Sequence, residues 1–166
     1  CFDTKGEIFS FLRDCLLVHG AEVVTVNVGV MGSTTLFPID VEATKVSETG
    51  GGKLEDIRSK NDRGYAMEIM GRGSAEILAD LYKQKKFDAV IGMGGGSGTY
   101  VTLKSMQNLP LGLPKICIST LASKDLSEQI GAKDIVMMPS VVDVAALNSI
   151  IKPIIQQAAA AIVAMC

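Results

Sequence analysis

The sequence has little of what several classes of protein require. Among 166 residues there is one histidine, His19, and the four cysteines include no C-x-x-C pair. Neither a zinc centre nor a Ser-His-Asp triad is therefore expected. No apolar run approaches the roughly 18 residues of a membrane span. The formal net charge of −2 comes without a long basic block, which argues against a nucleic-acid partner.

The cysteines also indicate the redox state of the cellular compartment. Cys15 and Cys117 lie inside apolar segments and are expected to be buried thiols. A disulfide framework is not expected, and a reducing, cytoplasmic location fits this usage best.

What is present is an alternation of apolar strands and amphipathic helices. It predicts one Rossmann-like α/β domain over residues 1–166, with a doubly wound and mostly parallel sheet. Residues 31–61 show no sustained period and are expected to form a long loop or lid. The predicted helices cover residues 7–19, 62–81, 100–107 and 148–165, and the predicted strands cover residues 23–30, 87–91, 114–120 and 134–140.

The beginning of the sequence resembles a connection between a strand and a helix. Residues 3–6, Asp-Thr-Lys-Gly, directly precede the first expected helix. Because such a turn normally follows a strand, we expect the chain to be a fragment of a larger domain that lacks its first strand.

The most informative stretch is glycine-rich. Gly92, Gly94, Gly95, Gly96 and Gly98 follow a short apolar run, together with Ser97 and Thr99, and a helix is expected directly afterwards. A glycine turn at a helix N-terminus lets backbone N–H groups approach a ligand, and the helix dipole favours negative charge. The stretch predicts phosphate or carboxylate binding, and the alternative is a purely structural turn.

Two other strand ends carry polar residues. In open α/β sheets, ligands bind beyond the carboxyl ends of the strands. The segments 119–123 and 140–143 should therefore lie beside the glycine stretch. The candidate residues in them are Ser119, Thr120, Ala122, Ser123, Ser140 and Asp143.

Charged residues at helix starts complete the candidate set. Lys5 is expected to pair with phosphate, with Asp3 or Thr4 at a metal or ribose, unless Asp3 or Thr4 only caps the helix. Arg63, followed by Gly64, would clamp phosphate, unless it is a solvated surface charge. Asp143 would orient a hydroxyl or magnesium, or cap the last helix. His19, at a helix end, is not expected to be catalytic.

Two familiar nucleotide motifs are absent. No Gly-Lys-Ser/Thr follows the glycines, so this is not a Walker P-loop. The dinucleotide fingerprint G-x-G-x-x-G is matched only in part, and no acidic residue follows at the expected distance.

Taken in order, these motifs resemble those of one family. Asp3–Gly6, the glycine stretch, Leu111–Lys115, Ser119–Ser123 and Ser140–Asp143 are similar to motifs of the Tm-1-like ATP-binding family. The chain departs from that family's pattern after Ser97, where a second Gly-Gly pair is usual.

The resemblance implies the N-terminal region of a longer protein, with two Rossmann-like lobes facing a nucleotide crevice. It implies ATP with magnesium as cofactor and a small phosphate ligand as partner, with weak ATPase activity as a further possibility. Two alternatives stay open: a regulatory or scaffold domain for a small anionic metabolite, and part of an enzyme acting on a carbonyl acid. The apolar segment 154–165 suggests a homodimer.

Overall fold

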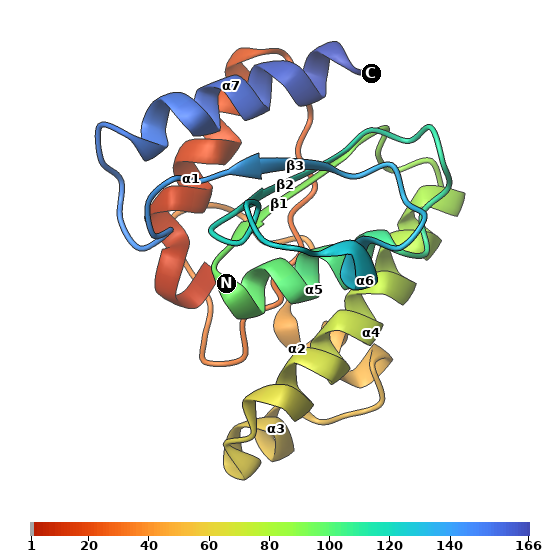
Figure 1. Ribbon diagram of the computed structural model, residues 1–166. Coiled ribbons are helices and arrows are strands. Elements are labelled where there is room, and N and C mark those ends of the chain that lie inside the picture. The colour runs from red at the N-terminus through yellow and green to blue at the C-terminus, as the bar shows by residue number, and fades with distance from the viewer. Residues whose placement is uncertain (1) are drawn as a thin grey trace.

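The computed structural model describes residues 2–166 and confirms the predicted α/β class (Figure 1). Three strands form one parallel sheet in the order β1-β2-β3. The strands are β1 (Val90–Gly94), β2 (Lys115–Ser119) and β3 (Val136–Pro139). The helices are α1 (Phe2–Val18), α2 (Ala43–Thr49), α3 (Leu54–Lys60), α4 (Arg63–Lys83), α5 (Gly96–Met106), α6 (Ser127–Ile130) and α7 (Ile151–Ala164).

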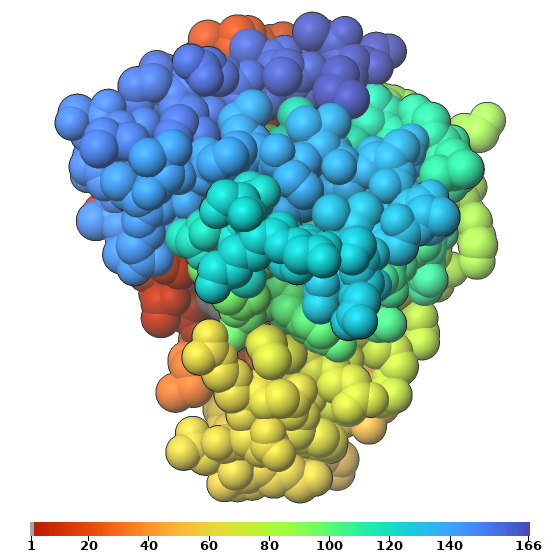
Figure 2. Space-filling view, viewed as in Figure 1, coloured from red at the N-terminus to blue at the C-terminus, as the bar shows by residue number. Residues whose placement is uncertain are grey.

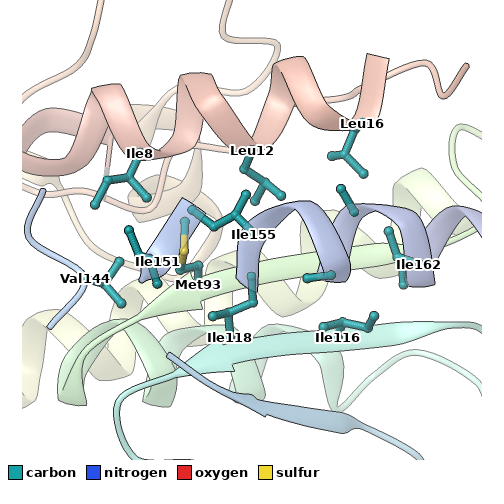
Figure 3. Close-up of a cluster of buried hydrophobic side chains, with 12 residues drawn as sticks. Ile8, Leu12, Leu16, Met93, Ile116, Ile118, Val144, Ile151, Ile155 and Ile162 are labelled. Atoms are coloured by element: carbon teal, nitrogen blue, oxygen red, sulfur yellow. The ribbon is translucent and has the colours of Figure 1, made fainter. Parts of the chain in front are cut away.

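Helices cover both faces of the sheet, as in a doubly wound fold. Helices α1 and α7 pack on one face through apolar side chains that meet Met93, Ile116 and Ile118 of the strands (Figure 3). Helix α5 covers the other face, where the side chain of Thr102 lies against Gly92. Side chains of a strand alternate between faces, and β2 is accordingly buried along its whole length, whereas Val90, Ile91 and Gly92 of β1 are only partly buried.

Local signals set several helix ends. The Asp62 carboxylate accepts a hydrogen bond of 3.1 Å from the N–H of Tyr65 and caps α4. Gly20, with φ of +84°, directly follows the last turn of α1 as a C-terminal glycine should. Helix α7 is capped by Asn148, whose amide oxygen accepts from the N–H groups of Ile150 and Ile151, so capping is not the role of Asp143.

Residues 31–61 differ from the loop or lid that their sequence suggests. They contain α2 and α3, which pack on α4 and form a second apolar cluster with Val46, Ile57 and Ile69 in its centre. A Cβ on Gly50 would lie 2.1 Å from the Ile69 carbonyl oxygen, so glycine allows this close contact. In Figure 2 this end of the molecule projects from the wider body that contains the sheet.

The predicted strand 23–30 is also different in the structure. These residues form only an isolated parallel bridge, between Val26 and Val41. β-branched residues favour an extended backbone, but a strand needs a neighbour along its length, and this segment has one for a single residue pair.

Among the described residues, no helix combines the length and the apolar character that a membrane span requires.

Candidate functional site

The three polar segments predicted from the sequence meet at the carboxyl ends of the strands. The N–H of Thr120 donates to the Gly94 carbonyl oxygen at 3.3 Å, and the N–H of Ser140 donates to the Ser119 carbonyl oxygen at 3.0 Å. These bonds connect the ends of β1, β2 and β3. The glycine stretch and the segments 119–123 and 140–143 therefore form one edge of the molecule.

Gly94 and Gly95 form a tight connection between β1 and α5. A Cβ on Gly94 would lie 2.6 Å from the Cα of Gly98, so a larger residue does not fit. Gly95 is the N-cap of α5, and no side chain caps this helix. The first-turn N–H groups of Gly96, Ser97 and Gly98 precede the helix's own hydrogen bonds. They are the groups for which the sequence predicts anion binding.

Two of the predicted site hydroxyls serve the structure. The Thr99 Oγ1 and Ser119 Oγ atoms lie 2.6 Å apart, and both residues are buried. Thr99 also donates to the Gly94 carbonyl oxygen, and Ser119 accepts from the N–H of Leu121. These contacts fix α5 to the ends of β1 and β2 beneath the site.

A small hollow lies next to the glycine stretch. Its volume is about 390 Å³. Thr120 lies between the hollow and the glycine stretch: its Oγ1 is 3.8 Å from the position that a Cβ on Gly95 would take. Thr120 and Ser123 offer hydroxyls and Asp143 an exposed carboxylate, whereas the Ser140 hydroxyl donates to the Val142 carbonyl oxygen. The hollow is lined by Ser119, Thr120, Ser123, Pro139, Val141, Val142 and Asp143; Ala122 is not among its lining residues.

The wall of this hollow contains an unusual backbone conformation. Val141 has φ of +64°, a region that a β-branched residue rarely adopts, and its side chain is 76% exposed. The turn around it is held by the N–H of Val142, which donates to the Ser140 carbonyl oxygen at 2.7 Å. Such conformations are found preferentially at functional sites. Nothing in the sequence around Val141 indicates this backbone conformation.

Arg63 brings positive charge to the glycine stretch. Its Nε donates to the Ser97 Oγ, and its Nη2 lies 3.9 Å from the position of a Cβ on Gly96. The first residue of α4 thus reaches the N-terminus of α5, across 34 residues of sequence. Gly64 is exposed, and a Cβ there would contact only Asp62.

The early candidates Asp3, Thr4 and Lys5 divide between two places. They lie inside α1, which is interrupted at Lys5 by non-helical backbone angles. The Lys5 Nζ donates to the Val144 carbonyl oxygen, one residue beyond Asp143. Asp3 instead accepts hydrogen bonds from the N–H groups of Thr4 and Met31. Lys5 therefore lies beside the β3 end of the site, and Asp3 ties α1 to the loop at residue 31.

The described residues contain no group of three or more His, Cys, Asp or Glu that could hold a metal. Burial raises the pKa of the Cys117 thiol in β2 to about 12, so this thiol stays protonated. It is buried as expected, whereas Cys15 is only partly buried. Cys1 lies outside the described residues.

Comparisons with known proteins identify relatives of this chain. Residues 1–166 match the model described as "Uncharacterised protein family (UPF0261) N-terminal domain". The chain belongs to this family. A UPF0261 protein of Clostridium tetani is 41% identical over 98% of the chain, and one of Rhizobium meliloti is 42% identical over the same share. The UPF0261 domain of this chain spans 40% of the length of each of these relatives.

The family also has similarity to plant proteins. The ToMV susceptible protein tm-1(GCR26) of Solanum lycopersicum is 36% identical to this UPF0261 domain over 114 residues, which is 69% of the domain and 14% of the plant protein. The resemblance expected from the motifs is thereby confirmed at the level of the family. ATP binding is a separate question.

Proposed function

We propose that the carboxyl edge of the sheet binds the phosphate groups of a nucleotide such as ATP. The observation that supports this most directly is the N-terminus of α5, which no side chain caps and beside which the Arg63 guanidinium lies. Backbone N–H groups, a helix dipole and a planar cation act together on a negatively charged oxygen. Thr120 and Ser123 add hydroxyl donors within the hollow.

Asp143 is compatible with magnesium in this proposal. A single exposed carboxylate in the hollow repels a free phosphate, but it attracts a cation bound to one. Magnesium usually takes only one or two carboxylates and fills its remaining positions with phosphate oxygens and water. The residues present fit such an ion only together with its nucleotide, and magnesium would supply charge neutralisation there.

The proposal is tested by titrating the intact protein with ATP and magnesium in a calorimeter. Replacing Arg63 by alanine should weaken binding about tenfold or more, since a hydrogen bond to a charged group contributes roughly 1.5–3 kcal/mol. Arg58→Ala is the matched control, because the Arg58 Nε donates to the Val30 carbonyl oxygen, away from the glycine stretch. Absence of binding at millimolar ATP would exclude the nucleotide.

A second variant probes the helix N-terminus itself. Gly96→Leu places a side chain at the first helical position, where a Cβ has no neighbour closer than 3.9 Å. The protein should fold with unchanged stability and lose binding, because the side chain covers the N–H groups. Unchanged affinity in this variant would show that the ligand does not use the glycine stretch.

A small anionic metabolite is the second candidate ligand. The hollow of about 390 Å³ lies near the lower end of the volumes typical of ligand pockets, which favours a compact guest. Competition between ATP and inorganic phosphate or small carboxylates distinguishes the two. A carbonyl acid that is turned over by the intact protein would favour the enzyme alternative instead.

Cytoplasmic location and a homodimer remain proposals. The apolar face of α7 that suggested a dimer is covered within the chain, because Ile151, Ile155 and Ile162 pack against α1 and the sheet (Figure 3). A dimer would need another surface. Light scattering of the intact protein gives its mass and decides this point.

A further inference from the structure

A long apolar cavity runs beside β1, on the side away from β2. Its volume is about 630 Å³. One wall is the extended segment 23–28 and the opposite wall is residues 89–93 at β1. Leu12 and Leu16 of α1 close it on one face, and Leu78 and Val101 of α4 and α5 close it on the other.

The backbone of β1 presents unpaired groups to this cavity. The N–H of Val90 donates to the Pro114 carbonyl oxygen, and the Gly94 carbonyl oxygen accepts from Thr120, so both residues face β2. Because backbone groups of successive residues in a parallel strand point to alternate sides, those of Ile91 and Met93 point into the cavity.

The opposite wall presents a matching row. Thr25 and Asn27 direct their backbone groups to Val41: the Val41 N–H donates to the Thr25 carbonyl oxygen, and the Asn27 N–H donates to the Val41 carbonyl oxygen. By the same alternation, Val26 and Val28 direct theirs into the cavity. Buried backbone groups are almost always paired, and a cavity bounded by two such rows matches a β-strand better than it matches a small apolar ligand.

The direction of α1 determines how that strand would run. The start of α1 lies at the carboxyl edge of the sheet, where Lys5 contacts the Val144 carbonyl oxygen. The segment 23–30 ends at the same edge, because Met31 donates to Asp3. It therefore runs in the direction of β1. A strand in the cavity that continues into α1 completes a βαβ unit with this segment.

We propose that the residues leading into α1 in the intact protein fill this cavity as a strand parallel to β1. The inference is independent of the proposed ligand. The added strand lies between segment 23–28 and β1 and enlarges the sheet to five strands. Because helices cover the cavity on both faces, the inserted residues should form a continuous apolar run.

Amide hydrogen exchange of the intact protein tests the proposal. The amides of Ile91, Met93, Val26 and Val28 should exchange at least roughly 1,000-fold more slowly than in an unstructured chain, as expected for a central strand in a domain of ordinary stability. Ile118, in the middle of β2, is the internal control. Fast exchange at Ile91 and Met93 beside slow exchange at Ile118 overturns the proposal.

Substitutions identify the occupant. Proline introduced singly through the roughly six residues that precede Cys1 should abolish the protection at Ile91 and Val26 and preserve that at Ile118. Where a proline also exposes Ile118, glycine at the same position gives the milder change. Protection that none of these substitutions alters overturns the proposal, as does protection that grows with protein concentration, which assigns the cavity to a second copy. Protection of Ile91 and Met93 that requires a bound apolar small molecule also overturns it.

Discussion

At the scale of single residues, glycine determines the shape of the candidate site more than any charged group does. None of Gly94, Gly95 and Gly96 has a positive φ. These glycines matter because they have no Cβ, and the space around the position of a Cβ differs sharply between them. Gly94 is in contact with the backbone of Gly98, whereas Gly96 is open.

This difference gives a stability prediction. Gly94→Ala should lower the free energy of unfolding by about 1–3 kcal/mol, as overpacking typically does, because the new Cβ would lie 2.6 Å from the Gly98 Cα. Gly96→Ala is the control, with no neighbour closer than 3.9 Å, and should leave stability nearly unchanged. Urea unfolding followed by circular dichroism measures both. Equal midpoints for the two variants would contradict the close contact.

At the scale of elements, β2 is anchored at its start by a buried lysine. Lys115 has no exposed surface, and its Nζ donates to the Asp134 carboxylate at 2.7 Å and to the carbonyl oxygens of Pro110 and Leu113. The Lys115 hydrogen bond and the N–H of Gly112 lower the pKa of Asp134 to about 2, from an ordinary 3.8. The segment before β3 is thereby tied to the start of β2.

The depressed pKa predicts a pH dependence. An acid with a lowered pKa in the folded state stabilises the fold above its unfolded pKa, and this contribution is lost as pH falls through the folded value. Asp134→Asn should therefore reduce the free energy of unfolding by about 1–3 kcal/mol at pH 6, since it removes one partner of a buried charge. Its difference from the natural protein should shrink as pH falls from about 4 towards 2.

An exposed ion pair serves as the control for this measurement. Asp80 and Lys83 lie 3.2 Å apart, with both side chains mostly exposed, and such pairs contribute little. Asp80→Asn should change the unfolding midpoint only slightly at every pH. An equal loss in Asp80→Asn and Asp134→Asn would argue against the anchoring role of Lys115.

At the scale of the whole molecule, the larger of the two main apolar clusters lies between α1, α7 and the sheet. Ile155 lies in the middle of this cluster and is fully buried (Figure 3). Ile155→Ala should cost about 2–5 kcal/mol, the usual range for a buried isoleucine. Ile150, which is 48% exposed, is the control on the same segment. Thermal unfolding measures both variants, and equal melting temperatures of Ile155→Ala and Ile150→Ala would contradict this arrangement.

The sequence predicted which segments share one edge of the sheet, but not how their side chains pair. The rule for parallel sheets placed the segments 94–99, 119–123 and 140–143 at one edge, and the structure joins them by hydrogen bonds. Which hydroxyls remain available depends on neighbours distant in sequence. Thr99 and Ser119 bond to each other across 20 residues, and no local pattern indicates such a pairing.

The sequence by itself determined the α/β class and the three apolar strands predicted at residues 87–91, 114–120 and 134–140, because these follow from local apolar period and turn chemistry. The structure places β1 later, at Val90–Gly94, and starts α5 at Gly96, inside the glycine stretch and before the predicted helix start at residue 100. Tertiary structure alone decided the rest. The short helices α2 and α3 depend on tertiary contacts, because a seven-residue helix has too little local stability of its own: α2 packs on α4, and α3 buries Leu54 and Ile57 in the same apolar cluster. The segment 23–30 lacks a strand partner along most of its length, and the cavity beside β1 is the place that we propose for one.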